Sequence, residues 1–185
     1  MSVAQFEAHW LASWVEEFGI DGFRCDTVKY VSKDSWKLLK EYSTDALEHW
    51  RDKNKGKDPA ASWTDPFYMT GEVWAFTNDP NDKSEYAKKG GFDSLIDFYF
   101  NPDGVNLNTC ITPDQSDWVT YGNLYGRLEG KPALMNMTYI SSHDTSLCRK
   151  KDMAKVGGNF LMLPGSVQIY YGDETNRQND MGVGI

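Results

Sequence analysis

The chain has 185 residues, of which 40% are hydrophobic and 14% aromatic, and its formal net charge is −8. This composition supplies enough apolar side chains for a packed core, so it excludes a disordered or fibrous chain, and the length indicates one domain or a large piece of one. The acidic charge disfavours nucleic acid as a partner, and no apolar stretch reaches the ~18–20 residues of a membrane span.

The N-terminal segment and the cysteines say little about the compartment. Met1–Trp10 has no basic start followed by an apolar core, so the sequence predicts no signal peptide here. The cysteines are odd in number and lack metal-like spacing, and we expect them to be packing thiols: Cys25, Cys110 and Cys148.

Helical and strand patterns alternate along the sequence. Apolar residues at helical spacing predict the helices, and compact apolar runs predict the strands. In chain order, the predictions are a helix over residues 1–18 that Gly19 ends, a turn and short strand in Ile20–Asp26, a helix capped by Asp34 or Ser35 and running to Trp50, a loop over Asp52–Pro59, a strand over Phe67–Glu72, a helix over Asp82–Lys89, a strand over Phe92–Phe100, a helix from Thr112 to Gly130, a strand over Met135–Ser141, a helix over Met153–Leu163 and a strand over Ser166–Tyr171.

This alternation predicts an α/β fold with parallel strands and right-handed helical crossovers. Two architectures fit: an open doubly wound sheet, or a stretch of a TIM (β/α)8 barrel. Both gather functional groups at the C-terminal ends of the strands. Asp26, Glu72 and the segment 142–144 (Ser-His-Asp) occupy such ends. No glycine-rich phosphate loop follows a strand, which disfavours nucleotide binding.

Two of these strand ends carry carboxylates in contrasting surroundings. Arg24 and Asp26 are two residues apart, so in a strand they share a face, where the guanidinium would keep the carboxylate ionised. Glu72 lies beside Trp74, and apolar surroundings favour a protonated carboxyl that can act as a general acid. A structural ion pair and a solvated strand-end glutamate are the alternatives without function.

Neighbouring parallel strands lie ~4.8 Å apart, so Asp26 and Glu72 can have carboxyl groups ~5–5.5 Å apart. That separation is typical of retaining glycosidases, in which one carboxylate attacks and the other donates a proton. Asp144 adds a third acid at a later strand end. Three acids can also hold a divalent metal ion, so a metal-dependent hydrolase remains an alternative at this point.

Four segments resemble the α-amylase family of glycoside hydrolases. Residues 19–30 (GIDGFRCDTVKY), 71–74 (GEVW) and 140–144 (ISSHD) are similar to its second, third and fourth conserved regions, and residues 169–174 (IYYGDE) resemble its last barrel strand. Within the family, the fourth region and the closing segment are most similar to periplasmic bacterial α-amylases. The resemblance implies a partial barrel, about strands 4 to 8, that is truncated at both ends of the single domain 1–185.

The resemblance also implies roles for individual residues. Asp26 would be the nucleophile, Glu72 the general acid and then base, and Asp144 a ligand of sugar hydroxyls. For Trp74, a place in the core is an equal alternative to stacking on a sugar. Arg24 would orient Asp26, and further sugar contacts would come from Lys29, Tyr30, Trp74 and His143.

Tyr30 departs from the family pattern, which usually has histidine there. In many members the backbone carbonyl at this position binds calcium, and a carbonyl does not depend on side-chain type, so calcium stays open for a longer parent protein. Its other ligands would come from outside this chain. The resemblance makes a periplasmic or extracellular parent an expectation, although the compartment itself stays unknown.

The implied function is retaining hydrolysis of α-1,4-glucosidic bonds in starch and maltodextrins. A non-catalytic carbohydrate-binding or scaffold protein with the same barrel is the alternative. Because a half barrel lacks part of the sugar-binding wall, we expect weak or absent hydrolysis by the chain alone. We also expect self-association, because the open sheet would have exposed edges.

Overall fold

The computed structural model describes residues 1–74, 80–98, 135–144, 153–162 and 165–177. The chain divides into two compact units, which are described one at a time. The first consists of Met1–Val73 and Asn81–Leu95, and the second of Trp74–Pro80 and Ile96–Ile185. Among the described residues, no helix is long and apolar enough to cross a bilayer.

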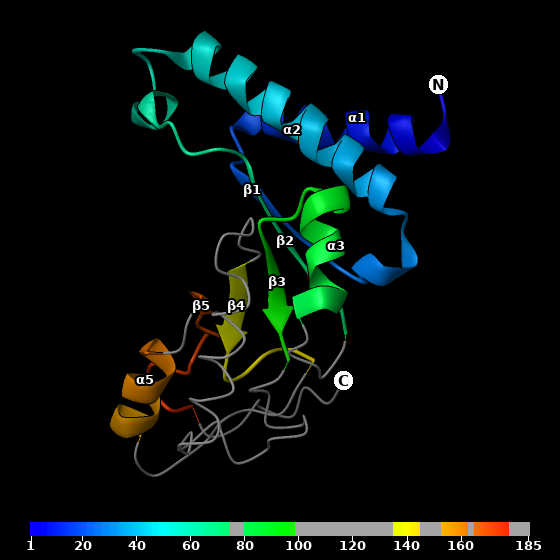
Figure 1. Cartoon of the computed structure of the whole chain (residues 1–185). Helices are drawn as coiled ribbons and strands as arrows, with labels where there is room; N and C mark the ends of the chain where they lie inside the picture. Colours follow the sequence, from blue (N-terminus) through cyan, green and yellow to red (C-terminus); the bar gives the residue numbers. More distant parts are fainter. Residues whose placement is uncertain (75–79, 99–134, 145–152, 163–164, 178–185) are drawn as a thin grey trace. The chain divides into compact units, whose positions relative to one another are not determined.

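Helices and parallel strands alternate as the sequence predicts (Figure 1). β1 pairs in parallel with β2 and β2 with β3, while in the second unit β4 pairs in parallel with β5. The elements are α1 (Val3–Phe18), β1 (Gly22–Cys25), the 3-10 helix η1 (Val28–Tyr30), α2 (Lys33–Asn54), the 3-10 helix η2 (Pro59–Ser62), β2 (Tyr68–Gly71), α3 (Pro80–Gly90), β3 (Ser94–Asp97), β4 (Met135–Tyr139), α5 (Met153–Leu161) and β5 (Ser166–Gln168).

All five strands and the helices near residues 1–18, 34–50, 82–89 and 153–163 are thereby confirmed, with shorter strands than predicted. The predicted helix from Thr112 to Gly130 lies outside the described residues. Two details were wrong. Ser32 caps α2 by accepting a hydrogen bond from the Ser35 amide, because α2 begins at Lys33 and not after Asp34 or Ser35. The predicted loop over Asp52–Pro59 starts later, since α2 continues to Asn54.

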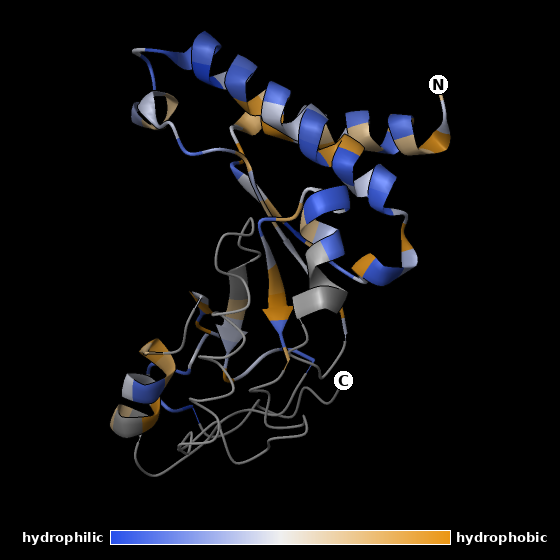
Figure 2. Ribbon diagram, in the orientation of Figure 1, coloured by the Kyte–Doolittle hydropathy of each residue, from blue (hydrophilic) through white to orange (hydrophobic). Residues whose placement is uncertain are grey.

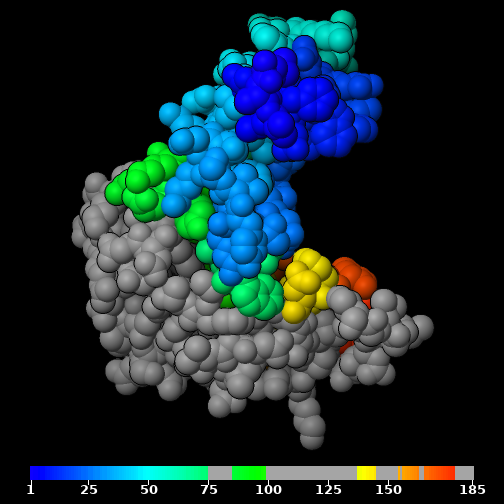
Figure 3. All heavy atoms as spheres, turned by 90° about the vertical axis from the view of Figure 1, so that its right-hand side faces the viewer, coloured from blue at the N-terminus to red at the C-terminus, as the bar shows by residue number. Residues whose placement is uncertain are grey.

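The helices α1 and α2 pack against each other (Figure 3), and the His9 ring of α1 stacks on the Tyr42 ring of α2 with centroids 4.1 Å apart. Ala8, Ala12 and Val15 of α1 are buried, as are Ser43 and Ala46 of α2. Gly19 ends α1 in the left-handed conformation with φ 67°, as expected for a helix stop.

Large apolar side chains of α1 lie on its uncovered side. Trp10 is 58% exposed and Phe18 57% exposed. Figure 2 shows hydrophobic residues on α1, whereas α2 is largely hydrophilic. The helical spacing of these residues thus predicted the helix correctly, but the large aromatic side chains of α1 are not part of the core of the first unit.

The side chains of β2 point alternately toward the helices and toward the opposite face of the sheet. Phe67 and Met69 are fully buried on one face. On the other face, the Tyr68 hydroxyl donates to the Ser94 hydroxyl at 2.6 Å, and Ser94 donates to the Thr70 hydroxyl at 2.7 Å. Glu72 follows Thr70 on this polar face, so the strand itself directs the Glu72 carboxyl there.

The second unit has a small core of its own. Ile96, Phe98 and Tyr139 form a buried cluster, and the Phe98 and Tyr139 rings meet edge to face with centroids 5.8 Å apart. The Thr138 hydroxyl donates to the Ser166 carbonyl at 3.1 Å, which adds a side-chain contact to the pairing of β4 with β5.

Candidate active site

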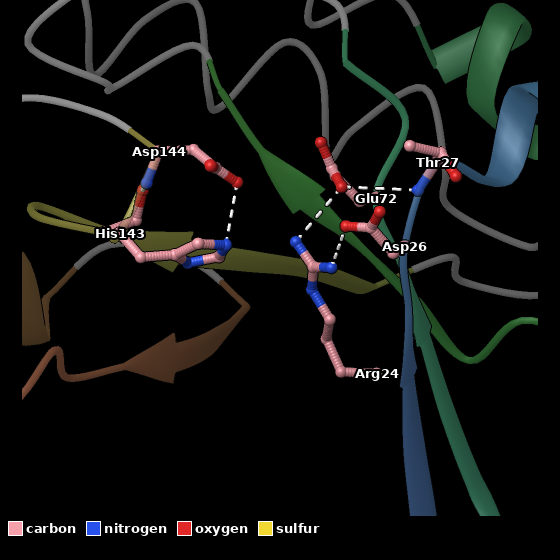
Figure 4. Close-up of polar contacts among 7 residues, drawn as sticks. Arg24, Asp26, Thr27, Glu72, His143 and Asp144 are labelled. Atoms are coloured by element: carbon pink, nitrogen blue, oxygen red, sulfur yellow. Dashed lines mark hydrogen bonds and ion pairs between the residues drawn. The ribbon is translucent and has the colours of Figure 1, made fainter. Parts of the chain in front are cut away.

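Two adjacent strands bring Arg24, Asp26 and Glu72 together in the first unit (Figure 4). The register pairs Arg24 with Thr70, and Cys25 with Gly71. Asp26 and Glu72 are therefore the next residues after this last pair, at the same end of the two strands, and both side chains lie on the polar face. The alternation in sequence predicted this placement before the register was known.

Arg24 binds both carboxyl groups at once. Its Nη1 donates to Asp26 Oδ1, and its Nη2 lies 3.1 Å from Glu72 Oε2. The two acids differ in exposure, since the Asp26 side chain is 60% exposed and that of Glu72 only 7%. The Arg24 guanidinium thus forms ion pairs with one exposed carboxylate and one buried carboxyl group.

The surroundings of Glu72 favour its protonated form. Burial raises the pKa of Glu72 above its ordinary value of 4.5, and a hydrogen bond with the Asp26 carboxyl raises it further. The Thr27 amide, which donates to Glu72 Oε2 at 3.3 Å, and the Arg24 charge both lower that pKa. The net direction is upward. A carboxyl that keeps its proton in this way is suited to general acid catalysis.

Asp144 and His143 follow β4 in the second unit. Their side chains form a pair, with His143 Nε2 2.8 Å from Asp144 Oδ2, and the Asp144 amide donates to the Ser142 hydroxyl at 3.3 Å (Figure 4). Both side chains are exposed. The pair can present a carboxylate acceptor and an imidazole donor to a polar ligand.

The other predicted binding residues are placed as follows. In η1, the Lys29 ammonium lies 5.2 Å from the centroid of the Tyr30 ring, and Tyr30 is strongly exposed. Trp74 belongs to the second unit, where its ring packs at a tilt against Phe98 with centroids 4.8 Å apart. Trp74 thus packs on the core while 38% of its surface is exposed.

Sequence reasoning missed Thr27. Its amide contacts the buried carboxyl of Glu72, 45 residues away, and its backbone is left-handed with φ 47°. A β-branched residue rarely adopts this conformation. Nothing in the local sequence signals it, because the contact that it makes depends on a different strand.

The described residues contain no group of three or more histidine, cysteine, aspartate or glutamate side chains that could hold a metal ion. The backbone carbonyl of Tyr30, which the resemblance associates with calcium, is not accompanied by such a group in this part of the chain. The residues that the structure describes therefore do not by themselves fit a calcium site.

The chain is similar to known proteins over most of its length. The family model described as "Alpha amylase, catalytic domain" matches residues 2–182. The chain is similar to the periplasmic alpha-amylase of Escherichia coli (strain K12), with 37% identity over 169 residues. That alignment covers 91% of this chain but only 23% of the relative.

Solved structures show the same fold. An alpha-amylase from Anoxybacillus superimposes with a TM-score of 0.61 at 23% identity, over 95% of this chain and 36% of that one. AmyP, whose structure was determined in complex with maltotriose, superimposes with a TM-score of 0.61 at 17% identity, over 96% of this chain and 39% of that one. The chain thus corresponds to a little over a third of each of these two structures, with part of their TIM-barrel fold.

Proposed function

Because the chain belongs to the alpha-amylase family, we propose that it carries part of the active site of a retaining glycoside hydrolase. The substrates would be the α-1,4-glucosidic bonds of starch and maltodextrins. The observation that carries this proposal is the single guanidinium that binds an exposed and a buried carboxyl at one strand end. Two carboxyl groups in contrasting environments are the arrangement in which one attacks and the other transfers protons.

The proposed reaction has two steps. Asp26 attacks the anomeric carbon while Glu72 donates its proton to the leaving oxygen, so that the glycosidic bond breaks and a glycosyl ester of Asp26 forms. Glu72, now ionised, takes a proton from water, and the water oxygen displaces Asp26 from the same carbon. The guanidinium that Asp26 and Glu72 share supports this mechanism, because it holds the two carboxyl groups beside each other, as the short carboxyl separation of retaining enzymes requires.

The remaining residues are assigned to binding. Arg24 orients Asp26, and Asp144 and His143 bind sugar hydroxyls through the acceptor and donor that their pair presents. Lys29, Tyr30 and Trp74 would contact further sugar rings, and Tyr30 and Trp74 are both exposed. The complex of AmyP with maltotriose supports an α-glucan as the ligand. The similarity to a periplasmic alpha-amylase supports a periplasmic or extracellular setting.

The test replaces Glu72 by glutamine and, as a matched control, the exposed Glu41 by glutamine. Both variants are made in the 185-residue chain and in a polypeptide that also contains the rest of the barrel, and are assayed on starch and on maltose. In the longer form, Glu72→Gln should lower turnover at least about 100-fold, the usual contribution of general acid–base catalysis, and Glu41→Gln should leave it unchanged. Unchanged turnover in Glu72→Gln would remove Glu72 as the proton donor.

We expect weak or absent turnover by the 185-residue chain, because misplacement of binding groups by about 1 Å can cost about 100-fold. Robust starch hydrolysis by the chain alone would contradict this expectation. Binding of maltodextrin without turnover in the longer form would instead favour a carbohydrate-binding protein.

Self-association of the chain forms a separate proposal. Among the described residues, no strand pairs with the second edge of β1, and large apolar side chains of α1 such as Trp10 and Phe18 are exposed. Open edges and exposed apolar side chains recruit other chains. Light scattering across a range of concentrations should show a rising average mass, whereas a constant monomer mass at high concentration would contradict the proposal.

A further inference from the structure

The turn after β1 contains one residue more than the parallel ladder requires. The Tyr68 amide donates to the Asp21 carbonyl and the Glu72 amide to the Cys25 carbonyl, both at 2.8 Å. In this register the next bond of a regular ladder would run from the amide of residue 27 to the Glu72 carbonyl. The Val28 amide takes that place at 3.0 Å, so Thr27 forms a one-residue bulge.

The bulge holds Thr27 in a conformation that its side chain does not favour. Its backbone is left-handed, with φ 47° and ψ 38°, although threonine is β-branched. The Thr27 side chain makes no capping hydrogen bond to η1, so helix capping does not account for this conformation. Such strain persists where the surrounding structure requires it, and it is concentrated at functional sites.

The bulge frees the Thr27 amide from the ladder and directs it to the Glu72 carboxyl. The amide donates to Glu72 Oε2 at 3.3 Å, the same oxygen that Arg24 Nη2 contacts at 3.1 Å (Figure 4). Two successive amides therefore bind Glu72. The Thr27 amide donates to its side-chain carboxyl, and the Val28 amide donates to its main-chain carbonyl.

From this geometry we infer that Thr27 is a positioning residue, whose bulged amide fixes Glu72 Oε2 and stabilises the carboxylate that remains after proton donation. The inference deepens the proposed function and rests on it for its catalytic meaning. Among the described groups, Arg24 and Asp26 are the charged side chains that act on Glu72. Thr27 adds an uncharged donor, which opposes the upward effect of burial on the pKa of Glu72.

The experiment removes the amide hydrogen and leaves the side chain in place. Replacing Thr27 by the corresponding α-hydroxy acid turns its amide into an ester, and Thr27→Gly serves as the matched control that keeps the amide and fits a positive φ. The carboxyl pKa of Glu72 is read in the 185-residue chain from the 13C chemical shifts of labelled glutamate. The Glu72→Gln variant assigns the signal.

We expect the ester to shift the titration of Glu72 to higher pH and Thr27→Gly to leave it where it is. An unshifted titration in the folded ester variant would overturn the inference, as would an equal shift in both variants. If the ester variant does not fold, deletion of Thr27, which restores the regular ladder, should give the same upward shift. Because this readout needs no turnover, the titration of Glu72 can stay unshifted while Glu72→Gln still abolishes hydrolysis. Conversely, the titration can shift as expected while Glu72→Gln leaves hydrolysis unchanged.

Discussion

Replacing Arg24 by methionine would leave two carboxyl groups facing each other without their shared cation. At 3.1 Å, the attraction between Arg24 and Glu72 is about 5 kcal/mol for an effective dielectric constant of 20. The Arg24 side chain is 34% exposed, so solvent screens much of that energy. Glu72, by contrast, is buried, and a buried carboxylate that loses its partner costs about 3–5 kcal/mol. This pair joins a partly exposed group to a buried one, so we expect a loss between the about 0–1 kcal/mol of an exposed pair and the about 3–5 kcal/mol of a buried one, namely about 2 kcal/mol in the free energy of unfolding at pH 8.

The loss should depend on pH. Below the pKa of Glu72 the carboxyl is neutral in the folded chain and its ion pair contributes little. As the pH rises, the carboxyl ionises, and the variant must bury a charge that the parent chain compensates. Arg24 lowers the pKa of Glu72, so removing Arg24 raises it further. The stability gap between the two proteins should therefore widen from pH 4 to pH 8.

Urea unfolding followed by tryptophan fluorescence at both pH values measures this gap. Lys37→Met is the matched control, because Lys37 also faces a glutamate, Glu41, at 3.7 Å, but both side chains are more than half exposed. The control should change stability by no more than about 0.5 kcal/mol at either pH. The reasoning fails if Arg24→Met is no more costly than Lys37→Met at pH 8.

Three further predictions concern stability and reactivity. Gly19→Ala should destabilise the chain by at least about 2 kcal/mol in the same urea assay, because the new Cβ would lie 2.4 Å from the Trp50 ring. The control Gly56→Ala should cost about 1 kcal/mol, because Gly56 has a similar φ but open space around it. Burial raises the pKa of the Cys25 thiol to about 12, so at pH 8 mass spectrometry should find it unmodified by iodoacetamide in the folded chain and modified in urea. Glu72→Gln should gain stability relative to the parent as the pH rises above about 4.5, because the folded parent binds a proton that its unfolded state releases; a gap independent of pH would contradict the raised pKa of Glu72.

Local signals account for what could be predicted of the fold. The helix α1 ends at Gly19 because a glycine can adopt the left-handed conformation there without steric cost. The short apolar runs identified the strands, and their alternation indicated parallel pairing. Arg24 and Asp26 share a face because the side chains of a strand alternate. Each of these inferences depends only on neighbours along the chain.

The face by which α1 packs could not be read from its pattern. The conspicuous apolar residues, such as Trp10 and Phe18, are exposed, and the buried contact uses Ala8 and Ala12. Helical periodicity shows that one side is apolar, but the partner helix decides which side chains are covered. In the same way, α2 is capped by Ser32, one of several hydroxyl and carboxylate residues in that stretch that could have served.

By itself, the order of residues determined the alternation of helices and strands and the position of two acids at neighbouring strand ends. Only the folded chain decided that one guanidinium holds both acids, and that a strained amide from Thr27 reaches the buried one. The reason is that periodicity is a property of adjacent residues, whereas burial, charge pairing and the bulge arise where segments distant in the chain come into contact.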